Sequence, residues 1–379
     1  MTQETILTNA ILVLPADTIR GTVVMRGAAI AEIQPGRSHA AGAIDLGGDT
    51  LMPGAVDVHT DNLERQVQPR SLARWPSRSA MVAHDAQCAA AGVTTVLDAL
   101  CVGDLGFEAD RIRTFHEGVI DLDTLTAARL LKVDHFLHLR CEVPADDVLA
   151  LFDPVADHPL VRMISLMDHS PGVGQYANLD FYRGLRRRDG MDEAAIEHRI
   201  AELQAQRARL RNPNRQALLD RVRGTTIAIA SHDDRTPEEV AENAADGIRI
   251  SEFPVTMEAA VAAKQAGMQV IAGAPNIVRR GSHSGNVAAA ELLRAGAVDA
   301  FASDYVPPSL IEAAFQCARE EGISLSAAVA MISDHPARMS GLPDRGRLEP
   351  GLRADLVQVH LHGILPVVRQ VWRAGERVI

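Results

Sequence analysis

Histidine and carboxylate residues recur at the ends of short apolar segments of this chain. His59 and Asp61 follow the first such segment, and both side chains face the same way because alternate residues of a strand share a face. Imidazole and carboxylate groups two residues apart can chelate a divalent cation. Five further segments end in similar groups, namely Glu142, His169, His232, Glu252 and Asp304. Burying so many ionisable groups together is costly unless a metal neutralises them, which predicts a metal centre.

The donor types indicate a catalytic rather than a structural centre. Imidazole and carboxylate ligands without a set of thiolates suit Zn²⁺, with Mn²⁺ and Fe²⁺ as alternatives. Two ions about 3.5–4 Å apart would use this many ligands. A carboxylated lysine bridges the ions in some barrels, but Lys132 and Lys264 are the only lysines and neither lies on the fourth strand. We therefore expect a glutamate to bridge, with Glu142 the best placed.

The segments that must position these groups alternate with helical sequence. Eight short runs rich in β-branched residues occupy 54–60, 92–100, 135–142, 160–169, 225–233, 247–253, 269–276 and 298–304. Alternation of strands and helices predicts parallel strands with crossover helices, and eight units predict a (β/α)₈ TIM-type barrel over 51–344. An open doubly wound sheet is the alternative, but the chain lacks its Gly-rich phosphate turn.

The two ends of the chain differ from the middle. Residues 1–50 and 345–379 consist of short strands punctuated by Gly and Pro, which predicts one small β-sandwich domain built from both ends, with two separate β-caps as the alternative. Residues 181–223 are charged and helical in pattern, and they interrupt the barrel between the fourth and fifth strands. This insertion is either a solvated helical hairpin or a lid that carries Arg186, Arg187 or Arg188 toward an anionic substrate.

Composition limits the classes of partner. The 379 residues carry 38 Lys and Arg against 49 Asp and Glu, a net charge of −11, which argues against nucleic-acid binding. No run approaches the roughly 20 apolar residues of a membrane span. The four cysteines form no C-x-x-C pair, which indicates reduced thiols in a cytoplasmic protein. The sequence leaves open whether the chain forms a homo-oligomer.

Several motifs resemble one family in particular. Residues 56–70 (VDVHTDNLERQVQPR) and 273–289 (GAPNIVRRGSHSGNVAA) are long and distinctive. Together with HLRCEVP, SLMDHSPG, ASHDD and SDYVPPSL, they resemble the α-D-ribose 1-methylphosphonate 5-triphosphate diphosphatases of the carbon–phosphorus lyase pathway, within the amidohydrolase superfamily. The resemblance runs from the first barrel strand to 353–359 and so covers nearly the whole chain.

The resemblance implies a metal-dependent hydrolase of phosphonate catabolism. Such an enzyme cleaves α-D-ribose 1-methylphosphonate 5-triphosphate to α-D-ribose 1-methylphosphonate 5-phosphate and pyrophosphate. The chain departs from the wider superfamily at Asp61 and Glu252, where many members carry histidine. His169 and Glu252 therefore compete for one ligand position. We expect metal ligands among His59, Asp61, Glu142, His169, His232, Asp304 and Glu252.

Catalytic and substrate-binding roles follow from the same residues. Asp304 is expected to accept a proton from the attacking water, with His232 and Glu142 as further catalytic residues. Residues 273–286 form a Gly/Ser-rich loop with arginines, which is typical of phosphate binding; a loop facing solvent is the alternative. The candidate substrate-binding residues are Arg140, Asn276, Arg279, Arg280, Ser282, His283, Asn62 and Arg65.

Arg140 either offsets the charge of Glu142 or reaches a phosphate. His84 and Asp85 are expected to open the helix before the second strand rather than to contact a ligand.

Two other classes of function stay open. A C–N hydrolase of the same superfamily, such as a deaminase or cyclic amidase, is the main alternative, although neutral amides need no arginine-rich loop. A barrel that binds without catalysis is the other, although such proteins typically lose their metal ligands.

Overall fold

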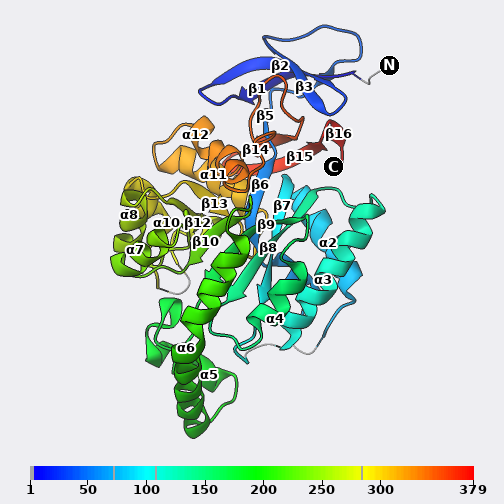
Figure 1. Cartoon of the computed structure of the whole chain (residues 1–379). Coiled ribbons are helices and arrows are strands. Elements are labelled where there is room, and N and C mark those ends of the chain that lie inside the picture. The colour runs from blue at the N-terminus through cyan, green and yellow to red at the C-terminus, as the bar shows by residue number, and fades with distance from the viewer. Residues whose placement is uncertain (1–3, 71–72, 107–108, 283–284) are drawn as a thin grey trace.

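The computed structural model describes residues 4–70, 73–106, 109–282 and 285–379, which form two sheets (Figure 1). The larger unit is a ring of eight parallel strands in sequential order. Its strands are β6 (Ala55–Thr60), β7 (Val93–Val102), β8 (Asp134–Glu142), β9 (Val161–Met167), β10 (Ala228–His232), β11 (Ile250–Glu252), β12 (Gln269–Gly273) and β13 (Ala300–Ala302). A parallel bridge between Thr60 and Asp304 brings the last strand beside the first. The predicted (β/α)₈ barrel is confirmed.

The helices of the structure pack around the barrel, except that the helix Leu179–Arg188 lies in a hairpin that projects from it (Figure 1). They are α1 (Asn62–Val67), α2 (Ser77–Ala90), α3 (Ala109–Ala127), α4 (Val148–Phe152), α5 (Leu179–Arg188), α6 (Glu193–Val222), α7 (Pro237–Ala245), α8 (Met257–Gln265), α9 (Ala274–Val278), α10 (Ala289–Arg294), α11 (Ser309–Glu320), α12 (Leu325–Ala330) and α13 (Asp334–Met339). Apolar side chains such as Val58, Leu97 and Met163 fill the barrel interior. Outward-facing strand residues such as Leu139 and Cys141 pack against the helices. The interior is therefore largely a packed core, and the polar groups that face the cavity lie at the strand ends.

The second sheet draws its strands from both ends of the chain. They are β1 (Glu4–Val13), β2 (Thr18–Arg26), β3 (Ala29–Pro35), β4 (Ile44–Asp45), β5 (Thr50–Pro53), β14 (Leu356–His362), β15 (Leu365–Arg373) and β16 (Glu376–Arg377). β14 pairs antiparallel with β5, which joins the two ends in one sheet. This confirms that both ends of the chain build one sheet, whereas their assignment to a β-sandwich domain stays a prediction. The exact domain boundaries stay predictions.

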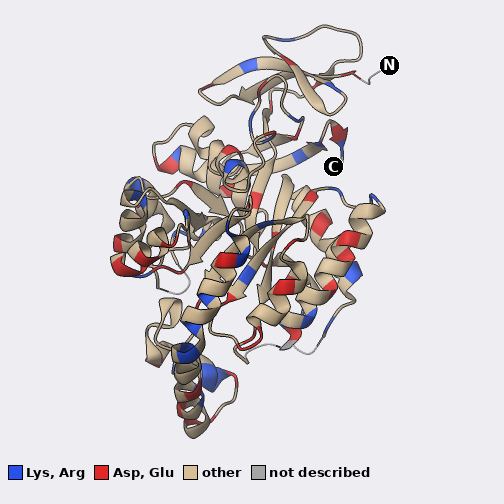
Figure 2. Ribbon diagram, in the orientation of Figure 1, with Lys and Arg blue, Asp and Glu red and all other residues tan. Residues whose placement is uncertain are grey.

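The charged insertion between β9 and β10 is a helical hairpin of α5 and α6. Asn178 and Asp192 cap the two helices, since their side chains accept hydrogen bonds from backbone N–H groups of the first turns. The hairpin lies at the opposite end of the molecule from the terminal sheet (Figure 1), and it carries many basic side chains (Figure 2). Among the described residues, no helix is long and apolar enough to cross a membrane.

Candidate active site

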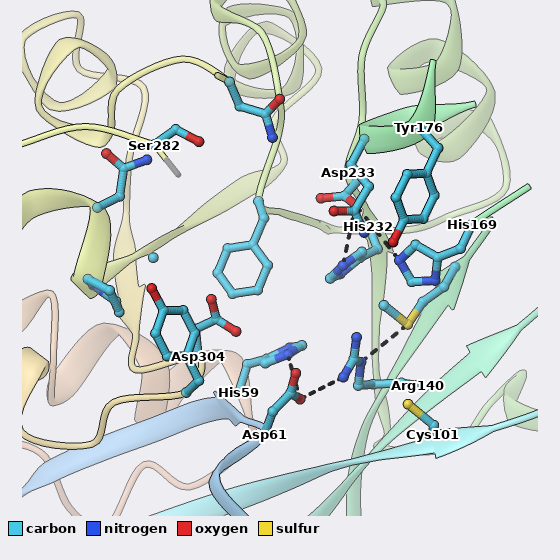
Figure 3. Close-up of a pocket in the computed structure, with 18 of the residues that line it drawn as sticks. His59, Asp61, Cys101, Arg140, His169, Tyr176, His232, Asp233, Ser282 and Asp304 are labelled. Carbon is cyan, nitrogen blue, oxygen red and sulfur yellow. Dashed lines mark hydrogen bonds and ion pairs between the residues drawn. The ribbon is translucent and has the colours of Figure 1, made fainter. Parts of the chain in front are cut away.

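The carboxyl ends of the barrel strands surround one cavity of about 560 Å³ (Figure 3). That volume lies within the range of small-molecule sites. Its floor is polar and comes from five strand ends, those of β6, β8, β9, β10 and β13. The floor residues are His59, Asp61, Arg140, Glu142, His169, His232, Asp233 and Asp304. Strand parity places Arg140 and Glu142 at the cavity, while Cys141 between them packs outward against the helices.

Glu252 lies behind two of the imidazoles rather than in the cavity. Its carboxylate accepts one hydrogen bond from His59 Nδ1 and one from His232 Nδ1, each of 2.8 Å. Glu252 is fully buried, and the positive potential of the imidazoles holds its pKa well below the ordinary value although burial opposes this. Because both Nδ1 atoms are engaged, Nε2 of each ring is the nitrogen available for a ligand.

Asp233 reaches the cavity because of an unusual backbone conformation. Strand alternation would turn Asp233 away from the side on which His232 lies. Its φ of 55°, however, places it in the left-handed region directly after β10. Phe253 and Asp304 follow β11 and β13 with φ of 54° and 57°. Asp233, Phe253 and Asp304 all line the cavity, so a residue with left-handed backbone follows three of the strands that surround it.

His169 faces the cavity through Nε2. Glu142 Oε2 accepts a hydrogen bond from His169 Nδ1 at 2.6 Å, and Glu142 Oε1 accepts one from the backbone N–H of His169 at 2.8 Å. His169 Nε2 and Asp233 Oδ2 are buried and have no hydrogen-bond partner among the described residues. Both Glu142 oxygens therefore serve His169 in this structure, and the bridging role expected for Glu142 stays a prediction.

Asp61 and Asp304 lie on the other side of His59. Asp61 Oδ1 is 3.5 Å from His59 Nε2, and Arg140 Nη1 donates a hydrogen bond of 2.6 Å to the same oxygen. Burial raises the pKa of Asp304 to about 6, and the negative charge of Asp61 adds to this rise. Burial lowers the pKa of His59, but the charges of Glu252 and Asp61 outweigh burial and raise that pKa to about 10. The three groups thus form a coupled electrostatic cluster.

The donor atoms fit divalent metal ions. The ligand atoms of three groups each lie within 4.8 Å of one another: His59, Asp61 and Asp304; His59, His232 and Glu252; and His169, His232 and Asp233. His169 Nε2 and Asp233 Oδ2 lie 3.9 Å apart without a hydrogen bond to either atom from the described residues, and a cation between them would satisfy both. His138 does not fit this role, because Nδ1 pairs with Val58 O at 2.9 Å and Nε2 with Ser165 Oγ at 3.0 Å.

The wall that follows β12 carries part of the expected phosphate loop. Asn276, Arg279 and Ser282 line the cavity, and Arg279 Nη1 lies 3.5 Å from the Tyr305 hydroxyl. Arg280 does not line the cavity and instead donates to Glu320 at 2.9 Å on the surface. His283 lies outside the described residues. The structure therefore brings three of these five candidates to the cavity.

Asn62 and Arg65 do not line the cavity, although they follow Asp61 closely. The Asn62 side-chain amide is buried and donates to Gln87 Oε1 at 3.0 Å, and its Nδ2 lies 2.9 Å from His84 Nδ1. Arg65 is exposed and donates to the backbone oxygen of Tyr305 at 2.7 Å. Asn62 links α1 to α2, and Arg65 links α1 to the end of the barrel.

Sequence reasoning missed several residues of the cavity. Asp233 was hidden by strand alternation, although its position next to His232 was a signal. Arg111 of α3 and Tyr176 before α5 carried no recognisable motif, yet both line the cavity. Within the insertion, Arg186 lines the cavity, whereas Arg187 forms an ion pair with Glu193 away from it.

Known proteins resemble this chain in sequence and in fold. The model of the amidohydrolase family matches residues 190–379. The chain is 40% identical over 376 residues to the alpha-D-ribose 1-methylphosphonate 5-triphosphate diphosphatase of Escherichia coli (strain K12), covering 98% of this chain and 100% of that protein.

Two solved structures share the fold. N-acetyl-D-glucosamine-6-phosphate deacetylase from Mycobacterium smegmatis aligns with this chain with a TM-score of 0.65 and 17% sequence identity. The alignment covers 100% of this chain and 100% of the deacetylase chain. 5-Methylcytosine deaminase from Klebsiella pneumoniae has a TM-score of 0.65 at 15% identity and covers 99% of this chain and 98% of its own. These likenesses concern the fold alone. On the family match and the full-length identity, the chain belongs to the amidohydrolase family, in the group that includes the E. coli diphosphatase.

Proposed function

We propose that this protein is a hydrolase that cleaves α-D-ribose 1-methylphosphonate 5-triphosphate to α-D-ribose 1-methylphosphonate 5-phosphate and pyrophosphate. The observation that carries the proposal is full-length similarity to the E. coli alpha-D-ribose 1-methylphosphonate 5-triphosphate diphosphatase. The cavity adds to it, because it combines imidazole and carboxylate groups that could bind metal ions with a wall whose side chains could bind phosphate. Arg279 and Ser282 stand beside the imidazoles and carboxylates of the floor. A neutral amide would need no such wall.

The floor would hold two divalent ions, with zinc the favoured metal. His59, Asp61 and Asp304 would hold one, and His169, His232 and Asp233 the other. When bound, divalent ions supply an acidified water at neutral pH and offset charge on phosphoryl oxygens. Glu252 and Glu142 would keep the imidazoles oriented through their Nδ1 atoms.

The protein's own groups have defined tasks in this reaction. A carboxylate oxygen of Asp304 takes the proton from the attacking water, because this side chain projects into the cavity beside His59 and Asp61. Arg279 and Ser282 orient the departing pyrophosphate, since guanidinium and hydroxyl donors match phosphate oxygens. Arg140 holds Asp61 in place and adds positive charge to the floor.

The direct test is pyrophosphate release from the triphosphate by protein loaded with zinc, with chelator as the control. Rapid release that chelator abolishes supports the proposal. Absence of release from well-metallated protein overturns it and favours the C–N hydrolase, which a panel of cyclic amides and aminated bases would then test. Oligomeric state and a cytoplasmic location stay predictions.

A further inference from the structure

A second cationic wall faces the cavity from the side of α3 and the α5–α6 hairpin. Arg111, Tyr176 and Arg186 all line it. The Tyr176 ring lies beside His169 (Figure 3). The distance between ring centroids is 6.0 Å from Tyr176 to His169 and 5.6 Å from Tyr176 to Tyr182. Arg186 lies over Tyr182, with 5.4 Å from Cζ to the ring centroid. Tyr176 thus lies between His169 of the cavity floor and Tyr182 of α5.

Both arginines act on the same place. Burial raises the pKa of the Tyr176 phenol, and the positive charges of Arg186 and Arg111 oppose that rise. Arg111 comes from α3 and Arg186 from α5, so two separate elements place cations along the cavity that Tyr176 also lines. Arg187, the next residue along α5, pairs with Glu193 instead. The orientation of Arg186 is therefore specific to its position on the helix.

The positive charge of this wall is partly offset. Arg186 Nη1 lies 3.0 Å from Asp189 Oδ2, and Arg111 Nε lies 3.0 Å from Glu64 Oε2. Leu105 and Ile112 add apolar surface to the same side of the cavity. A wall with moderated charge and an apolar lining suits an anion of low charge that carries an alkyl group. It suits a pyrophosphate group less well.

The proposed substrate carries such a group. A methylphosphonate esterified to C1 of ribose has one ionised oxygen and one methyl group, while the triphosphate at C5 is more highly charged. If the phosphorus attacked by water lies at the cavity floor, the methylphosphonate and the departing pyrophosphate lie on opposite sides of it. We propose that the wall of Arg111, Tyr176 and Arg186 is the methylphosphonate subsite and that the Arg279 and Ser282 wall takes the pyrophosphate.

This inference rests on the proposed function but has a test of its own. Calorimetric titration of metal-loaded protein would compare two ligands: α-D-ribose 1-methylphosphonate 5-phosphate, and ribose 5-phosphate, which lacks the phosphonate. The wild type should bind the phosphonate ligand about 10-fold more tightly or better, because a charge-assisted guanidinium contact contributes on that scale. Arg186→Gln should abolish this preference and leave affinity for ribose 5-phosphate within about twofold.

A second variant should shift affinity the opposite way. Asp189 competes with the phosphonate for Arg186, so Asp189→Asn should tighten binding of the phosphonate ligand by about threefold. Arg187→Gln is the matched control, because it removes one arginine from the same helical turn without touching the cavity wall. Arg187→Gln should leave both affinities unchanged.

The outcomes separate the two claims. Equal weakening of both ligands by Arg186→Gln, or no weakening of either, overturns the methylphosphonate subsite even if the wild type releases pyrophosphate rapidly. Loss of the preference in Arg279→Gln, with the preference kept in Arg186→Gln, shows that the substrate lies in the reverse orientation and also overturns it. A wild type that lacks diphosphatase activity yet shows the Arg186-dependent preference would overturn the proposed function and keep the subsite.

Discussion

Arg140 donates a hydrogen bond of 2.6 Å to Asp61, which joins the end of β8 to the residue that follows β6 across the cavity floor. Both residues lie among groups that would bind a metal cation. The permanent positive charge of Arg140 therefore lies beside the place where a metal ion would bind. Arg140 thereby fixes one oxygen of Asp61 and leaves the other for a different partner. This arrangement suggests that Arg140 serves geometry and phosphate attraction rather than metal retention.

Replacing Arg140 with Met should therefore separate activity from metal content. We expect kcat/KM to fall by about 100-fold, because the phosphoryl oxygens lose a cation that would offset their charge. Metal content should not fall, since removal of a guanidinium relieves repulsion of a bound cation. Steady-state kinetics and elemental analysis of the same preparation would measure both. A parallel loss of metal and activity would show instead that Arg140 acts mainly by holding a ligand.

Glu252→Gln tests the orientation of His59 and His232. The carboxylate accepts from both Nδ1 atoms, whereas an amide offers one acceptor oxygen and would present N–H to the other ring. We expect metal affinity to fall by about 10–100-fold, as is usual when an outer partner of a ligating imidazole is lost. Competition with a chelator would measure the affinity. Unchanged affinity would be inconsistent with an orienting role for Glu252.

Asp304→Asn tests the proton acceptor. The substitution keeps the shape and one oxygen of the side chain but removes its basicity, so kcat should fall by about 10²–10⁴-fold. Metal content should change far less than kcat. The measurement is kcat under saturating substrate, alongside metal analysis. If activity and metal content fall by the same factor, Asp304 acts only as a ligand.

A buried network outside the active site predicts a pH dependence of stability. His135 Nδ1 lies 2.8 Å from Asp98 Oδ2, and His135 Nε2 lies 3.3 Å from Asp85 Oδ1. Burial lowers the pKa of His135, but the charges of Asp98 and Asp85 outweigh burial and raise that pKa to about 9 from 6.5. The network stabilises the fold when His135 is protonated.

The sign of the effect follows from this raised pKa. Stabilisation by His135 is fully present below pH 6.5 and is lost as the pH rises through about 9. The difference in unfolding free energy between wild type and His135→Gln should shrink by at most about 1.4 kcal/mol per pH unit across that range. Urea denaturation from pH 6 to 9.5 would measure it, with the exposed His362→Gln as the control. A difference that does not vary with pH would contradict the ionised network.

The same network shows where local sequence was misleading. His84 and Asp85 were expected to open a helix, but α2 begins at Ser77 and buries both residues. His84 Nε2 lies 2.6 Å from Asp98 Oδ1 on the neighbouring strand β7. A polar pair inside a helix signals a partner on another element, and a single segment of sequence does not identify that partner.

The sequence by itself determined the architecture and the composition of the floor. Alternating apolar strands and helices imply a barrel, and a barrel gathers its strand ends at one face, so His59, Asp61, His169, His232 and Asp304 could be grouped without coordinates. Parity within a strand also placed Arg140 and Glu142 correctly at the cavity.

Tertiary structure decided the details that depend on turns and on distant elements. The left-handed backbone at Asp233 cancels strand parity and brings that side chain to the cavity. Glu252 lies behind His59 and His232 because it pairs in register with His232 and its carboxylate accepts hydrogen bonds from both rings. Arg111 of α3, Tyr176 and Arg186 of α5 line one cavity although they are far apart in the sequence. The periodicity of apolar residues indicates which side of a single strand or helix is buried, whereas the composition of a site depends on how several elements pack together.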